Sequence, residues 1–281
     1  MSTDYPNLIP PDGLRLPDAV TVTHGPARLL ANFVLQGDRV ARRAGLRLKL
    51  RHDMEQLNDL NQRQVELGNW YPLVNMFDPA RSDCSPANAF WISGENDAGE
   101  IISTAAARIY HWPDTTLEDE AVRMLYGHDD GQPCVITAKA AKLITGVISV
   151  AGAAWVRPDY RRRELSHLLP RIAKAYALSR WPLDWAVGYV TKLLVEKGVA
   201  AGYGQKHFSY SIEYPELPFG ELVLAYTSGQ EAYDDLGDYL MTELSSSTGT
   251  KFSAPSFSMT REHAVMKTSS DGVFHGSSSR S

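Results

Sequence analysis

Hydrophobic and polar positions near the start of the chain follow two different periods. Residues 27–43 place apolar side chains at helix spacing, and the opposite face, which holds Asp38 and several arginines, is expected to be solvated. Residues 46–52 alternate leucine with basic residues, which is the period of a half-buried strand. A polar helix is predicted to follow over residues 53–67. The pattern therefore predicts a helix, a strand and a second helix in that order.

The middle of the chain has the pattern of a hairpin, a buried strand and a long helix. Two predicted strands, residues 89–93 and 100–110, flank an Asn-Asp-Ala-Gly turn, which favours a hairpin. Residues 146–156 are small and branched, as in a buried strand. Residues 166–181 repeat apolar positions at helix spacing, although Pro170 removes one backbone donor near the helix start.

The rest of the sequence completes a mixed pattern of helices and strands. The further predicted elements are an inserted helix over 117–126, a strand over 185–190, a short helix over 191–201, strands over 207–213 and 221–227, and a last helix over 230–244. The first 24 residues are rich in proline and predict an irregular leader. Residues beyond 245 are rich in Ser, Thr and Gly, and we expect a flexible tail because they bury too little apolar surface to offset their ordering entropy.

Composition narrows the class of protein and its partners. Of the 281 residues, 43% are hydrophobic and 22% are charged, which supplies enough apolar material for a core. The net charge of −5 gives no general attraction to nucleic acid or to an anionic membrane. No apolar run has the length of a bilayer span and the N-terminus lacks the pattern of a secretory signal, so we expect a soluble, cytoplasmic protein.

The residues that commonly bind metals do not form a metal-binding pattern. Cys84 and Cys134 lie far apart, and no closely spaced histidine accompanies either of them. The His-Asp-Asp-Gly sequence at residues 128–131 is typical of a solvated loop. We therefore expect two free thiols and no metal.

Residues 153–166 are the segment with the clearest chemistry. A predicted strand ends at Val156, a turn holds Pro158, and the three arginines 161–163 precede a predicted helix. The start of a helix exposes unpaired N–H groups and the positive end of the helix dipole, and arginines add bidentate donors, so this junction predicts a phosphate site. The alternative is that the arginines only solvate the start of the helix.

The sequence Val-Arg-Pro-Asp-Tyr-Arg-Arg-Arg-Glu-Leu-Ser, residues 156–166, resembles the cofactor motif of the GNAT superfamily of N-acetyltransferases. The order of predicted elements over residues 46–227 is similar to that fold as well. The resemblance implies an α/β (α+β) fold with a GNAT-like mixed, mostly antiparallel sheet, splayed at its centre and flanked by helices. It also implies an N-acyltransferase that moves an acetyl or related acyl group from acyl-CoA directly to an amine of a small molecule or peptide.

The resemblance assigns two groups of residues to the cofactor. Backbone N–H groups of the loop would hold the CoA pyrophosphate, and the end of the strand would pair with the pantetheine arm and polarise the thioester carbonyl. The residues assigned in this way are Arg161, Arg162, Arg163, Glu164, Leu165 and Ser166 in the loop, and Ala154, Trp155 and Val156 in the strand. Glu164 stands where the motif has glycine, and its carboxylate is expected to point away from the pyrophosphate.

The resemblance also suggests a proton donor for the thiolate leaving group. Enzymes of this type often place a tyrosine after the fifth strand, and one alignment puts Tyr203 at that position. Another alignment puts Val195 there, and Tyr203 is then a packed aromatic. No general base stands out.

The domain organisation and the rival functions follow from these assignments. We expect an N-terminal extension with one helix (1–45), an acyltransferase domain (46–230), and a C-terminal helix with a flexible tail (231–281). The expected partners are acyl-CoA and an amine, with no nucleic acid and no membrane, and a homodimer is left open. Two alternatives are a silent module that binds CoA or another anion, and an interaction protein whose arginines meet an acidic partner.

Overall fold

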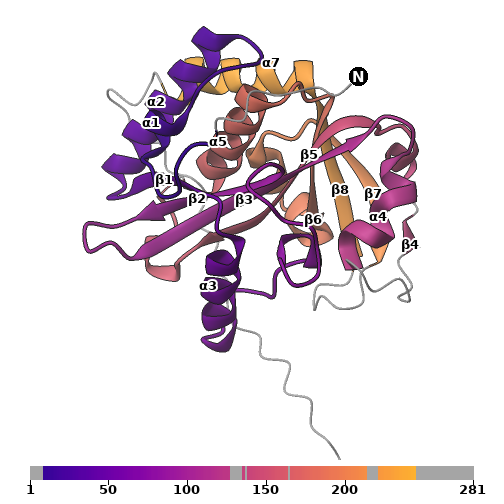
Figure 1. Ribbon diagram of the computed structural model, residues 1–281, viewed down its shortest axis with the longest axis horizontal. Helices are drawn as coiled ribbons and strands as arrows, with labels where there is room; N and C mark the ends of the chain where they lie inside the picture. The colour runs from indigo at the N-terminus through magenta and orange to yellow at the C-terminus, as the bar shows by residue number, and fades with distance from the viewer. Residues whose placement is uncertain (1–8, 127–134, 137, 164, 214–220, 245–281) are drawn as a thin grey trace, which may run out of the picture. The chain divides into compact units, whose positions relative to one another are not determined.

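The computed structural model describes residues 9–126, 135–136, 138–163, 165–213 and 221–244, which lie in one compact unit (Figure 1). Eight strands form one sheet in the order β1-β2-β3-β5-β6-β8-β7-β4. The strands are β1 (Arg47–Arg51), β2 (Ala89–Glu95), β3 (Ile101–Trp112), β4 (Val135–Ile136), β5 (Gly146–Val156), β6 (Trp185–Thr191), β7 (His207–Glu213) and β8 (Glu221–Ser228). Among the described strands, β5 and β6 alone pair in parallel, so the predicted mixed, mostly antiparallel sheet is confirmed.

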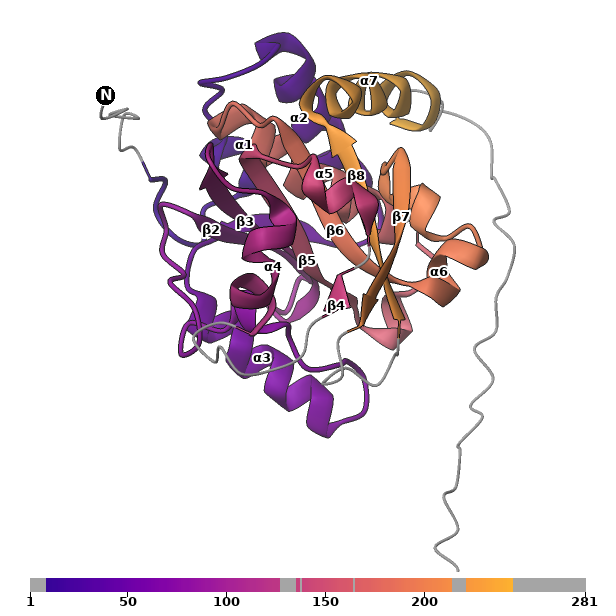
Figure 2. The same cartoon turned by 90° about the vertical axis from the view of Figure 1, so that its right-hand side faces the viewer.

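Helices cover both faces of the sheet (Figures 1 and 2). One face packs against α1 (Leu16–Ala19), α2 (Ala27–Arg43), α5 (Leu165–Arg180) and α7 (Gly229–Tyr239). The other face packs against α3 (Met54–Glu66) and α4 (Leu117–Tyr126) together with the short 3₁₀ turns η1 (Asn75–Phe77) and η2 (Lys139–Lys142). The short helix α6 (Lys192–Glu196) and the turn η4 (Ala200–Tyr203) connect β6 to β7.

The two cores follow directly from the period of the strands. Successive side chains on a strand point to opposite faces, so Phe90 joins the core under α2 and α5 while its neighbour Trp91 joins the core under α3 and η1. In β1, Leu48 and Leu50 are fully buried on the α2 side. The leucine and basic alternation of this strand was therefore interpreted correctly.

The polar face predicted for α2 is wrong at one position. Asp38 is only 2% exposed, and its Oδ2 accepts hydrogen bonds from Arg15 Nη2 at 2.9 Å and Arg42 Nε at 2.8 Å. The reason is the N-terminal segment, which packs α1 against α2 and delivers Arg15 to a face that would otherwise be solvated.

Two other expectations need correction. The predicted helix over 191–201 is interrupted: α6 ends at Glu196, Gly198 adopts a left-handed φ of 71°, and η4 begins at Ala200. A left-handed residue cannot continue an α-helix. The leader is irregular only in part, since α1 forms within it and Gly13 donates its backbone N–H to Leu50 O at 2.8 Å.

Some expectations lie outside the described residues, namely those on Cys134, on Glu164 and on the tail beyond residue 244. The division into extension, domain and tail stays a prediction. Within the described ranges, no helix is long and apolar enough to cross a membrane.

Candidate functional site

A bulge shapes the end of β5. Thr104 of β3 pairs with Trp155, whereas Ala106 pairs with Gly152, so β5 has one residue more than β3 over this stretch. Ala153 adopts a left-handed φ of 49°, which is unusual for a residue with a Cβ. Thr104 Oγ1 donates to Ala153 O at 2.6 Å and thereby stabilises the irregular backbone.

Beyond the bulge, β5 has one edge without a strand partner among the described residues. Its parallel pairing with β6 runs from Ile148 to Ala151 and then stops, while β6 continues alongside β8. Arg157 donates its N–H to Ile102 O at 2.8 Å. Backbone groups on a strand alternate in direction, so the N–H and C=O of Val156 point away from β3, toward the side from which β6 has diverged. The sheet is therefore splayed at this junction, as expected.

The loop after α3 closes over the end of β5. Trp155 is 4% exposed, and its Nε1 donates to Asn69 O at 3.1 Å. Its ring stacks on Trp70, with centroids 5.2 Å apart and planes inclined by 17°. The side chain of Trp155 is thus fixed in the fold, whereas Ala154 beside it is exposed. The backbone, rather than the side chain, is what this stretch can offer a ligand.

Arg161 lies across this junction and uses its donors on the protein itself. Its Nε donates to Val156 O at 3.1 Å, and its Nη2 lies 3.5 Å from Asn69 O. The guanidinium is therefore hydrogen-bonded to the Val156 carbonyl, in the strand segment that was predicted to pair with pantetheine. Because the side chain is exposed and both acceptors are neutral carbonyls, a ligand can displace it at modest cost.

The other two arginines diverge from Arg161. Arg163 Nη1 donates to Ala44 O at 3.0 Å, and its guanidinium lies 4.3 Å from the centroid of the Tyr160 ring. Arg162 is exposed and adopts a left-handed φ of 66°. The three side chains thus share one loop but do not converge on one point.

The helix that follows the arginine loop provides the positive end of a dipole. Leu165, its first residue, is buried in the core, and Ser166 is exposed. The helix has 16 residues. The N–H groups in the first turn of an α-helix lack intrahelical acceptors and carry partial positive charge. Pro170 lies inside the helix and has no backbone N–H to donate to the carbonyl four residues earlier. The structure accommodates this missing hydrogen bond because Pro170 is close to the helix start.

Tyr203 lies in η4, which packs against α5. Arg171 Nη1 donates to the carbonyl of Gly202, and Lys174 Nζ donates to the carbonyl of Gly204 at 2.5 Å. The residues on both sides of Tyr203 are therefore held by cations of α5. Burial raises the pKa of the Tyr203 hydroxyl, which keeps it protonated at neutral pH, as a proton donor must be. None of the described contacts brings Tyr203 against the edge of β5.

A buried ion pair supports this turn. Arg171 Nε lies 2.9 Å from Asp235 Oδ2, and both side chains are less than 10% exposed. Gly204 has a left-handed φ of 73°, and a Cβ there would collide with the Asp235 carboxylate. Burial lowers the pKa of Lys174 to about 8. The sequence analysis missed this cluster, although Arg171 and Lys174, among apolar residues in the middle of the helix, were a signal of it.

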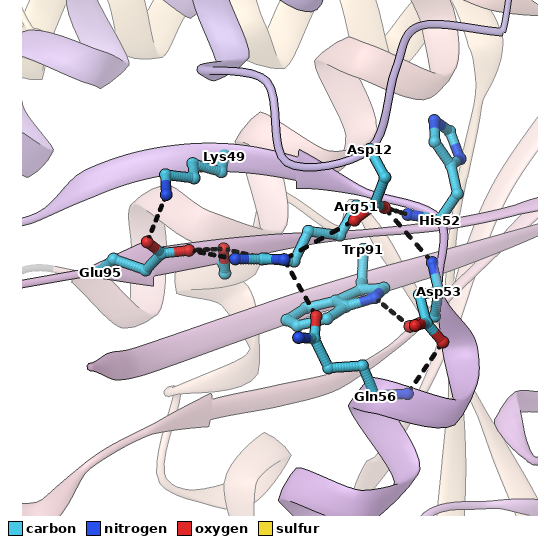
Figure 3. Close-up of polar contacts among 9 residues, drawn as sticks. Asp12, Lys49, Arg51, His52, Asp53, Gln56, Trp91 and Glu95 are labelled. Carbon is cyan, nitrogen blue, oxygen red and sulfur yellow. Dashed lines mark hydrogen bonds and ion pairs between the residues drawn. The ribbon is translucent and has the colours of Figure 1, made fainter. Parts of the chain in front are cut away.

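The largest ion network lies elsewhere, on β1 and β2 (Figure 3). Glu95 is 4% exposed and accepts from Lys49 Nζ at 2.7 Å and from Arg51 Nη2 at 2.5 Å. Arg51 also donates to Gln56 Oε1 at 3.0 Å, and Asp12 Oδ2 lies 3.7 Å from its Nη1. The charges balance within the network, so it fastens the N-terminal segment and α3 to the sheet and leaves no charge for a ligand. In the described part of the chain, no three potential metal-binding side chains gather.

No protein-family model matches the chain, and no curated protein matches its sequence. Solved structures with a similar fold include an uncharacterised protein from Bacillus halodurans, with 14% identity over 70% of this chain and 92% of the other, and a TM-score of 0.43. FeeM, an N-acyl amino acid synthase from uncultured soil microbes, has 12% identity over 66% and 93%, with a TM-score of 0.40. Mycobacterium smegmatis RimJ, solved with CoA-disulfide, has 12% identity over 69% and 90%, with a TM-score of 0.42.

Since these TM-scores are below 0.5, the fold assignment rests on the sheet itself. The sheet is mixed and mostly antiparallel, its one parallel pair of strands separates at the centre, and the arginine loop and α5 follow directly from the separated end of β5. The sheet therefore has the mixed, mostly antiparallel order, splayed at its centre and covered by helices, that the resemblance implied.

Proposed function

We propose that the protein is an acyl-CoA-dependent N-acyltransferase, which transfers an acetyl or related acyl group directly to an amine. The observation that carries the proposal is the bulged end of β5, whose edge has no strand partner among the described residues and which leads into an arginine loop and the start of α5. A backbone edge of this kind suits an extended amide-bearing chain, and the loop suits its phosphates. Both chemical parts of an acyl-CoA are thus matched by adjacent parts of one segment.

In this proposal, the residues from Ala154 to Val156 bind the pantetheine arm. The N–H of Val156 points to the open side and donates to the ligand, and the ligand's own amide replaces the Arg161 guanidinium on Val156 O. Arg161 is then released to pair with a phosphate, together with Arg162 and Arg163. Arginine suits this exchange because its planar donors form stronger, charge-assisted hydrogen bonds with phosphate oxygens than with neutral carbonyls.

The chemical step follows from the groups at hand. The neutral amine attacks the thioester carbonyl carbon, the C–N bond forms, the C–S bond breaks, and the carbonyl oxygen carries negative charge in between. A fixed N–H donor stabilises that charge. The leaving thiolate takes a proton from Tyr203, whose hydroxyl burial keeps protonated, and the resulting tyrosinate regains a proton from solvent. The amine loses its proton to solvent, since the described residues present no evident base.

The proposal is tested by acyl-CoA binding and turnover. We expect titration calorimetry with acetyl-CoA to show saturable binding, and thiol release to depend on an added amine. Arg161→Glu places a carboxylate beside the phosphates and is expected to abolish binding, while the melting temperature stays nearly unchanged because the side chain is exposed. Arg39→Glu, a reversal at another exposed arginine, is the matched control. Absence of binding at millimolar acetyl-CoA would refute the proposal.

The second candidate is a silent module that binds CoA or another anion. Glu164 in place of the motif glycine and the lack of an evident base favour it. The same assay separates the two candidates, because the silent module binds acetyl-CoA but releases no thiol with any amine.

A further inference from the structure

Arg108 is a buried cation that forms no ion pair with a carboxylate of the described residues. It lies on β3, on the face that packs against α3 and η1, and it is 7% exposed. Its Nη1 donates to Met76 O at 3.0 Å, and its Nε makes no hydrogen bond. The acceptor of Arg108 among the described residues is one neutral carbonyl, which Ser82 and Cys84 share. Buried charges are normally paired, so within the described part of the chain this guanidinium lacks an anion.

A second donor without a partner lies beside Arg108. Tyr110 is the next residue on the same face of β3, and among the described residues its buried hydroxyl has no hydrogen-bond partner of normal geometry. The Arg108 guanidinium lies 5.0 Å from the centroid of the Tyr110 ring. Burial raises the pKa of Tyr110, so the hydroxyl keeps its proton and can donate it. Two unused donors on one strand face are thus available to a single acceptor group.

Arg108 lies near the bulge of β5 and Tyr110 lies farther from it, because their partners on β5 are Val150 and Ile148 and the bulge follows Gly152. Met76, which accepts from Arg108, is followed by Phe77, and the ring of Phe77 covers Gly152 so closely that a Cβ on Gly152 would collide with it. Gly152 is two residues before Ala154, where the proposed acyl-donor edge begins. Tyr110 and Cys84 are half-buried as whole residues, whereas Arg108 Nε and the Tyr110 hydroxyl are themselves buried, so a ligand reaches these two atoms only when neighbouring side chains move.

We infer that Arg108 and Tyr110 bind the carboxylate of the acyl acceptor, so that the acceptor is an amine that also carries a carboxylate, such as an amino acid. The Nε edge of a guanidinium matches a planar carboxylate. One cation balances one negative charge, whereas a phosphate dianion would leave charge uncompensated in a buried place. The inference rests on the proposed function, since it names the substrate of that same site.

Matched acceptor pairs test the inference. Each amino acid is compared with the amine that differs from it only by loss of the carboxylate, for example tyrosine with tyramine. We expect the wild-type protein to favour the amino acid by about 100-fold or more in kcat/KM, because the amine leaves the buried cation unpaired. The amino acids alone should also raise the melting temperature, and the matching amines should not.

Arg108→Met removes the guanidinium and its charge and keeps an unbranched side chain that reaches as far as the Nε position. We expect the preference for carboxylate-bearing acceptors and the amino-acid thermal shift to disappear, while acetyl-CoA binding is retained. The variant should fold, because Met76 O keeps Ser82 Oγ at 3.1 Å and Cys84 Sγ at 3.2 Å as donors. Arg81→Met, at an exposed arginine on the neighbouring segment, is the control and should leave the preference unchanged.

The outcomes separate the inference from the proposed function. If the wild-type protein acylates amino acids and their decarboxylated counterparts equally well, the carboxylate site is wrong and the acyltransferase stands. If Arg108→Met keeps the preference, the site is likewise wrong. If no amine supports thiol release, the proposed function fails, and the thermal shift by amino acids then reports on the carboxylate site alone.

Discussion

Tyr203 is held in place through its neighbours rather than through its own side chain. The carbonyls of Gly202 and Gly204 accept hydrogen bonds from Arg171 and Lys174, so the backbone on both sides of Tyr203 is fixed. In the proposed reaction, Tyr203→Phe removes the proton donor without disturbing these hydrogen bonds. We expect kcat to fall by about 10²- to 10⁴-fold, with KM for acetyl-CoA unchanged, in steady-state assays.

The control is Tyr210→Phe, at an exposed tyrosine of β7. A change of less than threefold in kcat for Tyr203→Phe would show that Tyr203 is a packed aromatic, which was the alternative from the sequence.

Lys174 makes the free energy of unfolding vary with pH in the alkaline range. Burial lowers its pKa from 10.5 to about 8. Between these values the unfolded chain binds a proton that the folded chain lacks, so the free energy of unfolding rises with pH across this window, by roughly 3 kcal/mol in total. This added stability is fully present above pH 10.5, where Lys174 is neutral in both states, and it is lost as the pH falls to 8.

Denaturant unfolding of the wild-type protein and of Lys174→Met between pH 7 and 10.5 measures this contribution. Other titrating groups cancel in the difference between the two proteins. We expect the wild type to gain stability relative to the variant as the pH rises. A difference that is independent of pH would mean that Lys174 titrates normally and is not desolvated.

At the scale of single elements, β5 combines a regular ladder with an edge that has no strand partner among the described residues. Its ladder to β3 uses the N–H of Arg157, whereas the N–H of Val156 points the other way. Val156→Pro should therefore remove a ligand donor but no ladder bond. We expect acetyl-CoA affinity to fall about tenfold, measured by calorimetry, with near-wild-type thermal stability.

Val156→Ala, which loses most of the side chain but keeps the N–H, is the matched control and should retain affinity. Equal affinity of the proline variant and the wild type would show that this amide does not contact the ligand.

The same strand shows how far the sequence predicts the structure. The bounds of β5, residues 146–156, were predicted correctly because a run of small and branched residues is a local signal. The bulge was not predicted, since Ala153 carries no sequence signal for a left-handed φ and its conformation depends on Thr104 of a distant strand. Gly198, in contrast, was a recognisable end signal for α6 that the prediction passed over.

The candidate site divides in the same way. The strand end and the helix start were predicted from local pattern, and the structure confirms their place in the chain. The directions of Arg161 and Arg163 were not predicted, because Arg163 and one donor of Arg161 reach acceptors, Ala44 and Asn69, that lie far away in sequence. Arg108 was overlooked as well, because one arginine in an apolar strand reveals nothing about its burial or its missing partner.

At the scale of the whole molecule, the Glu95 network joins the N-terminal segment, β1, β2 and the start of α3 (Figure 3). Burial raises the pKa of Glu95, but hydrogen bonds from Lys49 and Arg51 outweigh that effect and lower the pKa below its ordinary value of 4.5. Because the folded pKa is depressed, the carboxylate stabilises the fold above pH 4.5, and this stabilisation is lost as the pH falls through the folded pKa.

Glu95→Gln removes the charge and keeps the shape, and it tests whether this network holds the N-terminal segment to the sheet. We expect a loss of about 2 kcal/mol in the free energy of unfolding at pH 7, because Arg51 keeps Gln56 as an acceptor while Lys49 can turn toward solvent. The loss should shrink as the pH falls below 4.5, since the wild-type carboxylate then becomes neutral as well. Hydrogen exchange in β1 should accelerate in the variant at pH 7, whereas exchange in β6, four strands away across the sheet, should not. Uniform acceleration in both strands would mean that Glu95 supports the whole fold rather than the attachment of its N-terminal segment.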